Sequence, residues 1–173
     1  SGHSFLDRIE HCSEVTPRVQ TLLRRSKVAI VTQPGFLYDS GERYAAQVNK
    51  EIQPWLYPLR TIWDLALPLA AGSDAPVAPP NPWLGVYGAV TRRNASGTTL
   101  HWEQRLSLEQ ALRLYSSGAA AVAREDAIKG KIQPGKLADL VLVDRDLTRV
   151  EPEELLKAQA TLTMVGGQVV WES

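Results

Sequence analysis

Residues 28–32 read Val-Ala-Ile-Val-Thr, and Gln-Pro-Gly follows at residues 33–35. A short run dominated by β-branched residues and stopped by Pro-Gly is typical of a strand buried in a parallel sheet. Two comparable strand-like segments, residues 7–11 and 67–72, lie before and after it in the chain. The stretch therefore predicts that the first part of the fold is built on a parallel sheet.

Helical segments are expected between and after these strands. Thr16 and Pro17 fit an N-cap followed by a proline in the first helical turn. Further helices are predicted over residues 55–65 and 83–91, and a Ser-Leu-Glu-Gln capping box begins another over residues 107–123. Strands that alternate with helices favour an α/β fold with right-handed crossovers between parallel strands.

Two polar connections interrupt this alternation. Residues 36–54 show no clear period, so we expect a long loop there, and residues 94–105 form a second polar excursion. Loops of this length inside a compact domain are commonly functional. Tyr38 and Trp83 are therefore candidates to contact a substrate, although packing of a helix on the sheet is the favoured explanation for Trp83.

The C-terminal residues follow a different pattern from the rest of the chain. A strand is expected over residues 139–144 and a short helix over residues 151–158, and a Gly-Gly turn between residues 165 and 168 predicts a β-hairpin. We therefore divide the chain into an α/β part, residues 1–127, and a β-rich part, residues 128–173.

The composition is that of a globular protein and excludes several functional classes. The 173 residues are 44% hydrophobic and carry equal numbers of basic and acidic side chains. A net charge of zero argues against a nucleic-acid partner, and the longest apolar run, residues 65–71, is too short to span a membrane. A single cysteine, Cys12, favours a cytoplasmic location. The chain enters its first strand abruptly, which suggests that the natural N-terminus is missing.

Three polar side chains follow the three predicted strands. In parallel α/β folds the chemistry lies at the carboxyl ends of the strands, which selects His11, Gln33 and Asp74. An imidazole nitrogen and a carboxylate both bind divalent metals, and a carboxylate can also take a proton from water. A histidine hydrogen-bonded to a backbone carbonyl and a turn-forming aspartate are the simpler structural alternatives.

Several motifs resemble one enzyme superfamily. The segments Arg-Ile-Glu-His-Cys at residues 8–12, Val-Thr-Gln-Pro at 31–34 and Gly-Ser-Asp-Ala-Pro at 72–76 are similar to the amidohydrolase superfamily. The Pro-Gly-Lys-x-Ala-Asp-Leu signature within residues 130–141 and the closing Val-Gly-Gly-Gln-Val-Val at 165–170 extend the resemblance over nearly the whole chain. The similar branch is amidohydrolase family 3, which includes N-substituted formamide deformylase-like enzymes.

The resemblance implies both a fold and a site. Residues 1–127 would form the C-terminal part of a (β/α)8 TIM barrel, about strands six to eight, and residues 128–173 would belong to a composite β-sandwich. His11 matches a metal ligand, and Asp74 matches an aspartate that lies at the metal and transfers protons during hydrolysis of an amide-like C–N bond. Gln33 lies where substrate contacts are common.

The chain departs from the family pattern, because it lacks the His-x-His pair and the further ligands that earlier strands supply. His3 is too close to the first strand to replace them, and His101 is expected to be a surface residue. Closed zinc sites use about four ligands. We therefore expect the isolated chain to bind zinc or a similar divalent metal weakly or not at all, and to be inactive.

Two other readings of the chain are possible. It could be a non-catalytic scaffold or binding module that kept the fold, or a metal-independent hydrolase in which Glu10 and Asp74 form an acid–base pair. Cys12 is expected to be a structural thiol, because neighbouring strand residues point to opposite faces. Arg92 and Arg93 could receive an anionic group, but a solvated helix end is the favoured explanation.

Association between chains is the last expectation. A few strands of a barrel leave open edges, and apolar strand residues that a complete barrel would bury become exposed. Val28, Ile30, Leu67 and Leu69 belong to this class. We expect a homo-oligomer formed through these edges, acting on a small amide-like substrate, with no nucleic acid and no membrane as partner.

Overall fold

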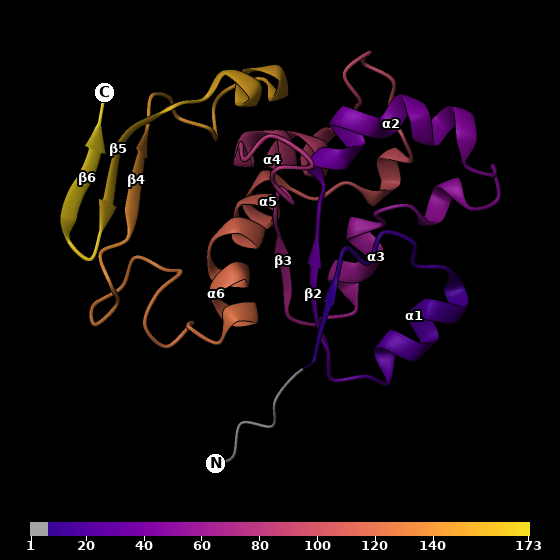
Figure 1. The fold of residues 1–173 in the computed structure, drawn as a ribbon, viewed down its shortest axis with the longest axis horizontal. Helices are drawn as coiled ribbons and strands as arrows, with labels where there is room; N and C mark the ends of the chain where they lie inside the picture. The colour runs from indigo at the N-terminus through magenta and orange to yellow at the C-terminus, as the bar shows by residue number, and fades with distance from the viewer. Residues whose placement is uncertain (1–6) are drawn as a thin grey trace.

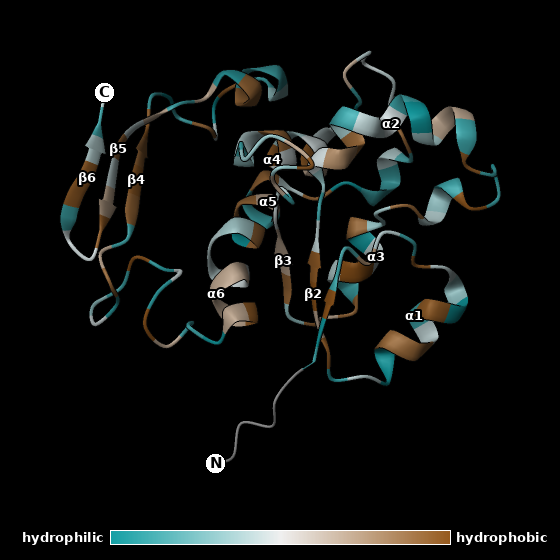
Figure 2. Ribbon diagram, viewed as in Figure 1, coloured by the Kyte–Doolittle hydropathy of each residue, from teal (hydrophilic) through white to brown (hydrophobic). Residues whose placement is uncertain are grey.

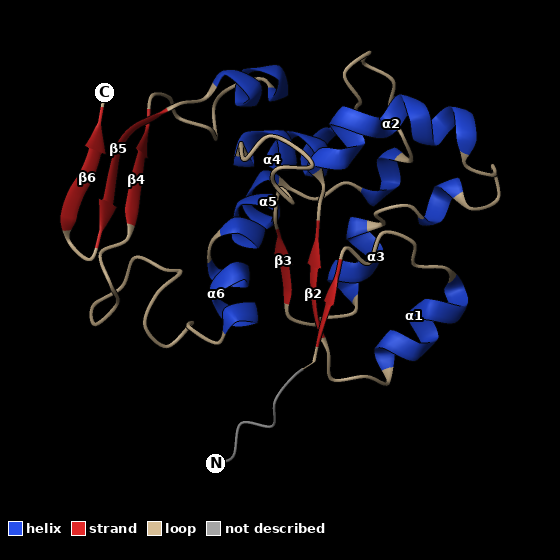
Figure 3. Ribbon diagram, viewed as in Figure 1, coloured by secondary structure: helices blue, strands red, loops and turns tan. Residues whose placement is uncertain are grey.

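The computed structural model describes residues 7–173, so that His3 and its neighbours lie outside the described part. The described chain forms two three-stranded sheets (Figures 1 and 3). The first is parallel, with strand order β1-β2-β3, and the second is antiparallel, with order β4-β5-β6. In Figure 1, α5 and α6 lie between the two sheets.

The parallel sheet confirms the prediction made from residues 28–32. Its strands are β1 (Arg8–Glu10), β2 (Ala29–Thr32) and β3 (Leu69–Ala71). Ile30 of the central strand pairs with Ile9 on one side and with Leu69 on the other. The three strands run in the same direction, and helices connect them, so the first part of the chain has the expected α/β arrangement.

Helices flank this sheet, and several begin where the sequence indicates. Thr16 and Pro17 start the first helix, and Ser107 and Gln110 form the predicted capping box. The helix expected over residues 107–123 is interrupted at Ser116, whose backbone leaves the helical region. The helices are α1 (Pro17–Arg24), α3 (Leu59–Asp64), α4 (Pro82–Thr91), α5 (Leu108–Tyr115) and α6 (Ser117–Ala123), with a 3-10 turn η2 (Trp102–Gln104) in the polar excursion.

The expectation of a loop over residues 36–54 is wrong. A helix, α2 (Gly35–Gln47), occupies most of this segment, and a 3-10 turn, η1 (Gln53–Trp55), follows it. Gly35 and Gly41 have a low helix propensity, so the local sequence does not predict this helix. Packing against α4 stabilises it. The two helices approach so closely that a Cβ on Gly88 would lie 2.3 Å from the carbonyl oxygen of Pro34.

The hydrophobic core lies between the parallel sheet and its helices. Ile30, Leu59 and Ile62 are fully buried, and residues from α4 and α5 complete the cluster. The expectation that Ile30 and Leu69 would be exposed is wrong: they are 0% and 6% exposed, because α5 and α6 pack against these strands. In Figure 2 the strands β2 and β3 are coloured mainly as hydrophobic. No helix within residues 7–173 has the length and hydropathy to span a membrane.

The C-terminal sheet is exposed. Its strands are β4 (Leu140–Val143), β5 (Ala160–Val165) and β6 (Gln168–Glu172), and Gly166 and Gly167 form the predicted hairpin turn with positive φ. The short helix expected before β5 is a 3-10 helix, η3 (Pro152–Lys157). Every residue of β6 is exposed to solvent.

One contact region ties the C-terminal part to the α/β part. η3 packs against α4, and Leu155 of η3 is buried in the main core with 3% exposure. At the surface beside it, Arg93 Nη1 donates to Glu153 Oε1 at 2.6 Å. The second sheet is therefore linked to the core mainly through the segment that precedes β5.

Candidate functional site

The three side chains selected from the sequence lie together at the carboxyl edge of the parallel sheet. Nδ1 of His11, after β1, lies 3.1 Å from Oε1 of Gln33, after β2. The same nitrogen lies 4.0 Å from Oδ2 of Asp74, after β3. Strand ends of one parallel sheet thus bring together residues that are up to 63 positions apart in the sequence.

The backbone at this edge adopts conformations that non-glycine residues rarely use. His11, Cys12 and Asp74 have φ values of 66°, 44° and 60°. Such conformations cost on the order of 1–3 kcal/mol each and concentrate at functional sites. They also end the strand alternation, so the side-chain directions of His11 and Cys12 do not follow from strand periodicity.

The segment after His11 is held by a second stretch of chain. Tyr57 N donates to the carbonyl oxygen of Ser13 at 2.7 Å, and Val15 N donates to the carbonyl oxygen of Trp55 at 3.0 Å. These hydrogen bonds join residues 13–15 to residues 55–57 as a short antiparallel bridge. The position of His11 therefore depends on the connection between α2 and α3.

Arg92 stabilises this connection, and the expectation that it is a solvated helix end is wrong. Its side chain is fully buried, and it donates to the carbonyl oxygens of Tyr57 at 2.5 Å, Leu56 at 3.1 Å and Leu100 at 2.9 Å. Burial lowers the pKa of Arg92 to about 10, so it stays charged at neutral pH. Local sequence gave no signal for this role, because the acceptors lie in other segments.

The two aromatic candidates pack against the core. Tyr38 of α2 contacts Tyr87 of α4 edge to face, with ring centroids 5.5 Å apart. Trp83 lies in the first turn of α4, where Asn81 caps its backbone N–H, and its ring is partly buried against the core. Both residues have structural contacts that account for their positions, and a role in substrate binding stays a prediction.

Two groups beside the site have environments that argue against direct chemistry. Burial raises the pKa of the Cys12 thiol, which disfavours the thiolate that a nucleophile requires. Glu10 forms an ion pair with Arg8 on its own strand. That pairing occupies the carboxylate that would act together with Asp74 in a metal-independent hydrolase.

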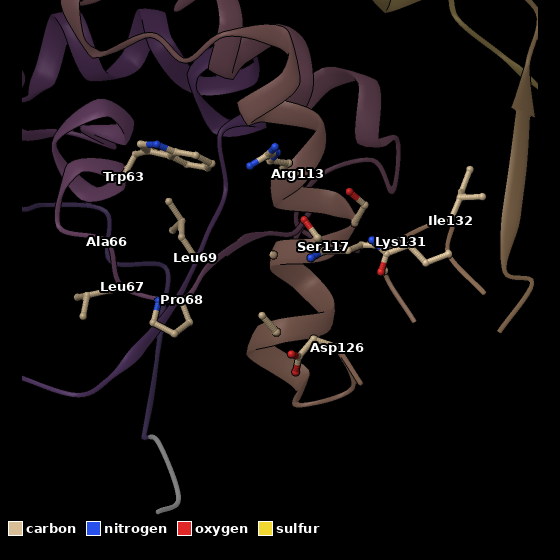
Figure 4. Close-up of a pocket in the computed structure, with 15 residues that line it drawn as sticks. Trp63, Ala66, Leu67, Pro68, Leu69, Arg113, Ser117, Asp126, Lys131 and Ile132 are labelled. Atoms are coloured by element: carbon tan, nitrogen blue, oxygen red, sulfur yellow. The ribbon is translucent and has the colours of Figure 1, made fainter. Parts of the chain in front are cut away.

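A cavity lies elsewhere in the described part of the chain. Three segments surround this cavity of about 760 Å³: the residues that lead into β3, helix α6, and residues 130–133. Trp63, Arg113 and Lys131 lie on its walls (Figure 4). Its lining includes Leu69, the first residue of β3, and Pro68 just before it. The cavity therefore lies at the opposite edge of the sheet from His11 and Asp74.

The described residues supply only part of a metal site. Within residues 7–173 no group of three or more histidine, cysteine, aspartate or glutamate side chains is close enough to hold a metal ion. His11 offers one ring nitrogen and Asp74 one carboxylate, both partly exposed at the edge of the sheet. Nitrogen and oxygen donors of this kind suit zinc.

Comparisons with known proteins agree with the resemblance noted from the sequence motifs. The family model described as amidohydrolase family matches residues 2–171. The Bacillus subtilis protein YtcJ is 26% identical over 96% of this chain and 32% of its own length. An N-substituted formamide deformylase from Arthrobacter pascens is 26% identical over 84% of the chain and 27% of its own length.

Solved structures show the same fold. An uncharacterized metal-dependent hydrolase from Pyrococcus horikoshii superimposes with a TM-score of 0.75 at 30% identity, covering 84% of this chain and 30% of that one. Guanine deaminase from E. coli gives a TM-score of 0.70 at 20% identity, covering 96% of this chain and 39% of that one. The chain spans about a third or less of the length of the curated relatives it matches. By the family match over nearly all of its residues, the chain belongs to the amidohydrolase family.

Proposed function

We propose that this chain is the C-terminal part of a metal-dependent amidohydrolase, which hydrolyses a C–N bond in a small amide-like substrate. The observation that carries the proposal is the 4.0 Å approach of His11 Nδ1 and Asp74 Oδ2 at the carboxyl edge of the sheet. The membership in the amidohydrolase family and the similarity to an N-substituted formamide deformylase support the choice of bond.

The same proposal assigns the architecture. Strands β1, β2 and β3 would be about the sixth to eighth strands of a (β/α)8 barrel formed with residues 1–127, and residues 128–173 would be one part of a β-sandwich. Parallel pairing with helical connections supports the first assignment, and the antiparallel sheet supports the second.

His11 and Asp74 would hold the metal together with ligands from other strands. A bound divalent metal supplies a water of lowered pKa and polarises the carbonyl group of the substrate. Two donors are fewer than the roughly four of a closed zinc site, so the isolated chain would bind zinc weakly and have no turnover.

Asp74 would also transfer protons. Its carboxylate takes a proton from the attacking water and returns it to the nitrogen that leaves when the C–N bond breaks. Its partial exposure and its place after β3 leave it accessible to a substrate at the carboxyl edge. Tyr38 and Trp83 are the proposed substrate contacts, whereas Gln33, for which the sequence predicted the same role, is only 3% exposed and contacts His11.

The test uses the complete gene product that carries this chain, loaded with zinc. Asp74→Asn keeps a residue that tolerates the left-handed backbone but removes the base, and should lower kcat by about 100-fold to 10,000-fold on short N-acyl amines. Asp64→Asn, on the exposed face of α3, is the matched control. Unchanged turnover in Asp74→Asn would overturn the role proposed for Asp74, and no hydrolysis by the native protein would favour a non-catalytic scaffold.

We also propose that the isolated chain associates with itself. Val141, Val170 and Trp171 are exposed by 52%, 59% and 47%, and β4 and β6 both present free edges. Apolar sheet surface with open edges is a common interface. Light scattering at low micromolar concentration should show a dimer or larger species, and a stable 19.1 kDa monomer would contradict this.

A further inference from the structure

We propose that Gln33 is a positioning residue for His11. Its amide oxygen accepts the Nδ1 proton of His11, which leaves the Nε2 lone pair for a ligand and leaves the Asp74 carboxylate free of the imidazole. The inference rests on the proposed function for the use of Nε2 as a metal ligand. The proton position on the ring can be measured without a metal or a substrate.

Distances decide between the two possible acceptors. Oε1 of Gln33 lies 3.1 Å from Nδ1, within the range of a hydrogen bond. Oδ2 of Asp74 lies 4.0 Å from the same nitrogen, beyond that range. A proton on Nδ1 would therefore be directed to the neutral amide and not to the carboxylate.

Burial shows which member of the pair is fixed. Gln33 is 3% exposed, whereas the side chain of His11 is 51% exposed. Phe36 N donates to the backbone oxygen of Gln33 at 3.1 Å as α2 begins. The next residue, Pro34, is fully buried with its carbonyl against Gly88 of α4. An exposed imidazole is thus oriented by an amide whose backbone is enclosed.

The orientation of the ring determines which nitrogen of His11 can bind a metal. A neutral imidazole carries its proton on one nitrogen, and the hydrogen bond of that nitrogen sets which nitrogen is left to bind a metal. Metal-binding histidines commonly donate the other N–H to a carboxylate or carbonyl oxygen. If Asp74 were that acceptor, its oxygen would be engaged by the imidazole. Gln33 accepts the proton with a neutral group, so the Asp74 carboxylate stays available for the metal and for proton transfer.

The test is the tautomer of neutral His11, observed from the ring nitrogens of the 15N-labelled chain by NMR. The chain has three histidines, so His11→Gln assigns the signal. Because Asp74 could replace a lost acceptor, the decisive variants are made in Asp74→Gly, where glycine suits the positive φ of that position. Backbone amide spectra confirm that each variant is folded.

We expect the Nδ1–H tautomer in the native chain and in Asp74→Gly. The double variant Gln33→Met/Asp74→Gly should lose this preference, and Gln33→Glu/Asp74→Gly should retain it because an acceptor oxygen is restored. Loss in Asp74→Gly alone would make the aspartate the acceptor. An Nε2–H tautomer in the native chain, or Nδ1–H that survives in Gln33→Met/Asp74→Gly, would overturn the proposal.

Adding zinc separates this inference from the proposed function. A zinc-dependent shift of Nε2 in the native chain that weakens in Gln33→Met supports the positioning role. The expected tautomers with no zinc effect at His11 would leave the positioning of the ring intact and count against the metal role. Zinc binding at Nε2 that is equally strong in Gln33→Met would support the metal role and overturn the part assigned to Gln33.

Discussion

The two sheets of this protein contain the same number of strands but differ in what covers them. In β2, Ala29, Ile30 and Thr32 are buried, whereas all of β6 is exposed. Figure 2 shows hydrophobic residues in both sheets, but within residues 7–173 helices pack closely only against the parallel sheet. Backbone hydrogen bonding alone therefore does not make a core, and the region that carries the candidate site is the region with its own packing.

The largest loss of stability is expected from a substitution of Arg92, in the part of the protein that contains the parallel sheet. Arg92→Met removes three hydrogen bonds to buried or partly buried carbonyl oxygens, and should lower the free energy of unfolding by about 3–5 kcal/mol. The neighbouring Arg93→Met removes only an exposed ion pair with Glu153 and should cost about 0–1 kcal/mol. Urea denaturation of both variants measures the difference, and equal losses would contradict the account.

A direct comparison of the two sheets uses one buried and one exposed strand residue. Ile30→Ala creates a cavity in the core and should cost about 2–5 kcal/mol. Val170→Ala, in β6, should change the free energy of unfolding by about 0.5 kcal/mol or less, because the side chain is 59% exposed. A loss of similar size at Val170 would show that β4–β6 is covered in solution.

The same comparison shows which parts of the fold and of the site can be predicted from the sequence. The β-branched run of residues 28–32 predicted its strand, and the strand-end rule brought together His11, Gln33 and Asp74. Helix α2 was missed because its stability comes from contact with α4, which no local pattern reveals. Arg92 was misjudged for the same reason, since one of its acceptors lies 35 residues away in the sequence.

A steric change tests the packing of α2 on α4. Gly88→Ala would place a Cβ 2.3 Å from the oxygen of Pro34, so backbone must move, and we expect a loss of about 1–3 kcal/mol and altered NMR signals at Gln33. Gly35→Ala meets only ordinary contacts, the nearest at 3.6 Å, and is the matched control. Identical behaviour of the two variants would mean that the helices do not pack as described.

The smallest expected effect concerns pH and belongs to the C-terminal part. Hydrogen bonds from Arg145 and from the backbone of Gln159 lower the pKa of Asp144 to about 2. A depressed carboxyl pKa stabilises the fold above the unfolded pKa of about 4, and this contribution is lost as pH falls toward 2. The protection of the Gln159 amide against hydrogen exchange, measured relative to its intrinsic rate at each pH, should therefore fall between these values. Asp144→Asn should remove that pH dependence, and an unchanged profile would contradict the assignment.

Calorimetric titration of the isolated chain with zinc tests whether His11 and Asp74 form part of one metal site. We expect weak, saturable binding that is lost in both His11→Gln and Asp74→Gly and kept in His101→Gln, with no zinc retained after dialysis. Binding that persists in His11→Gln and Asp74→Gly, or one zinc per chain held firmly through dialysis, would contradict this expectation.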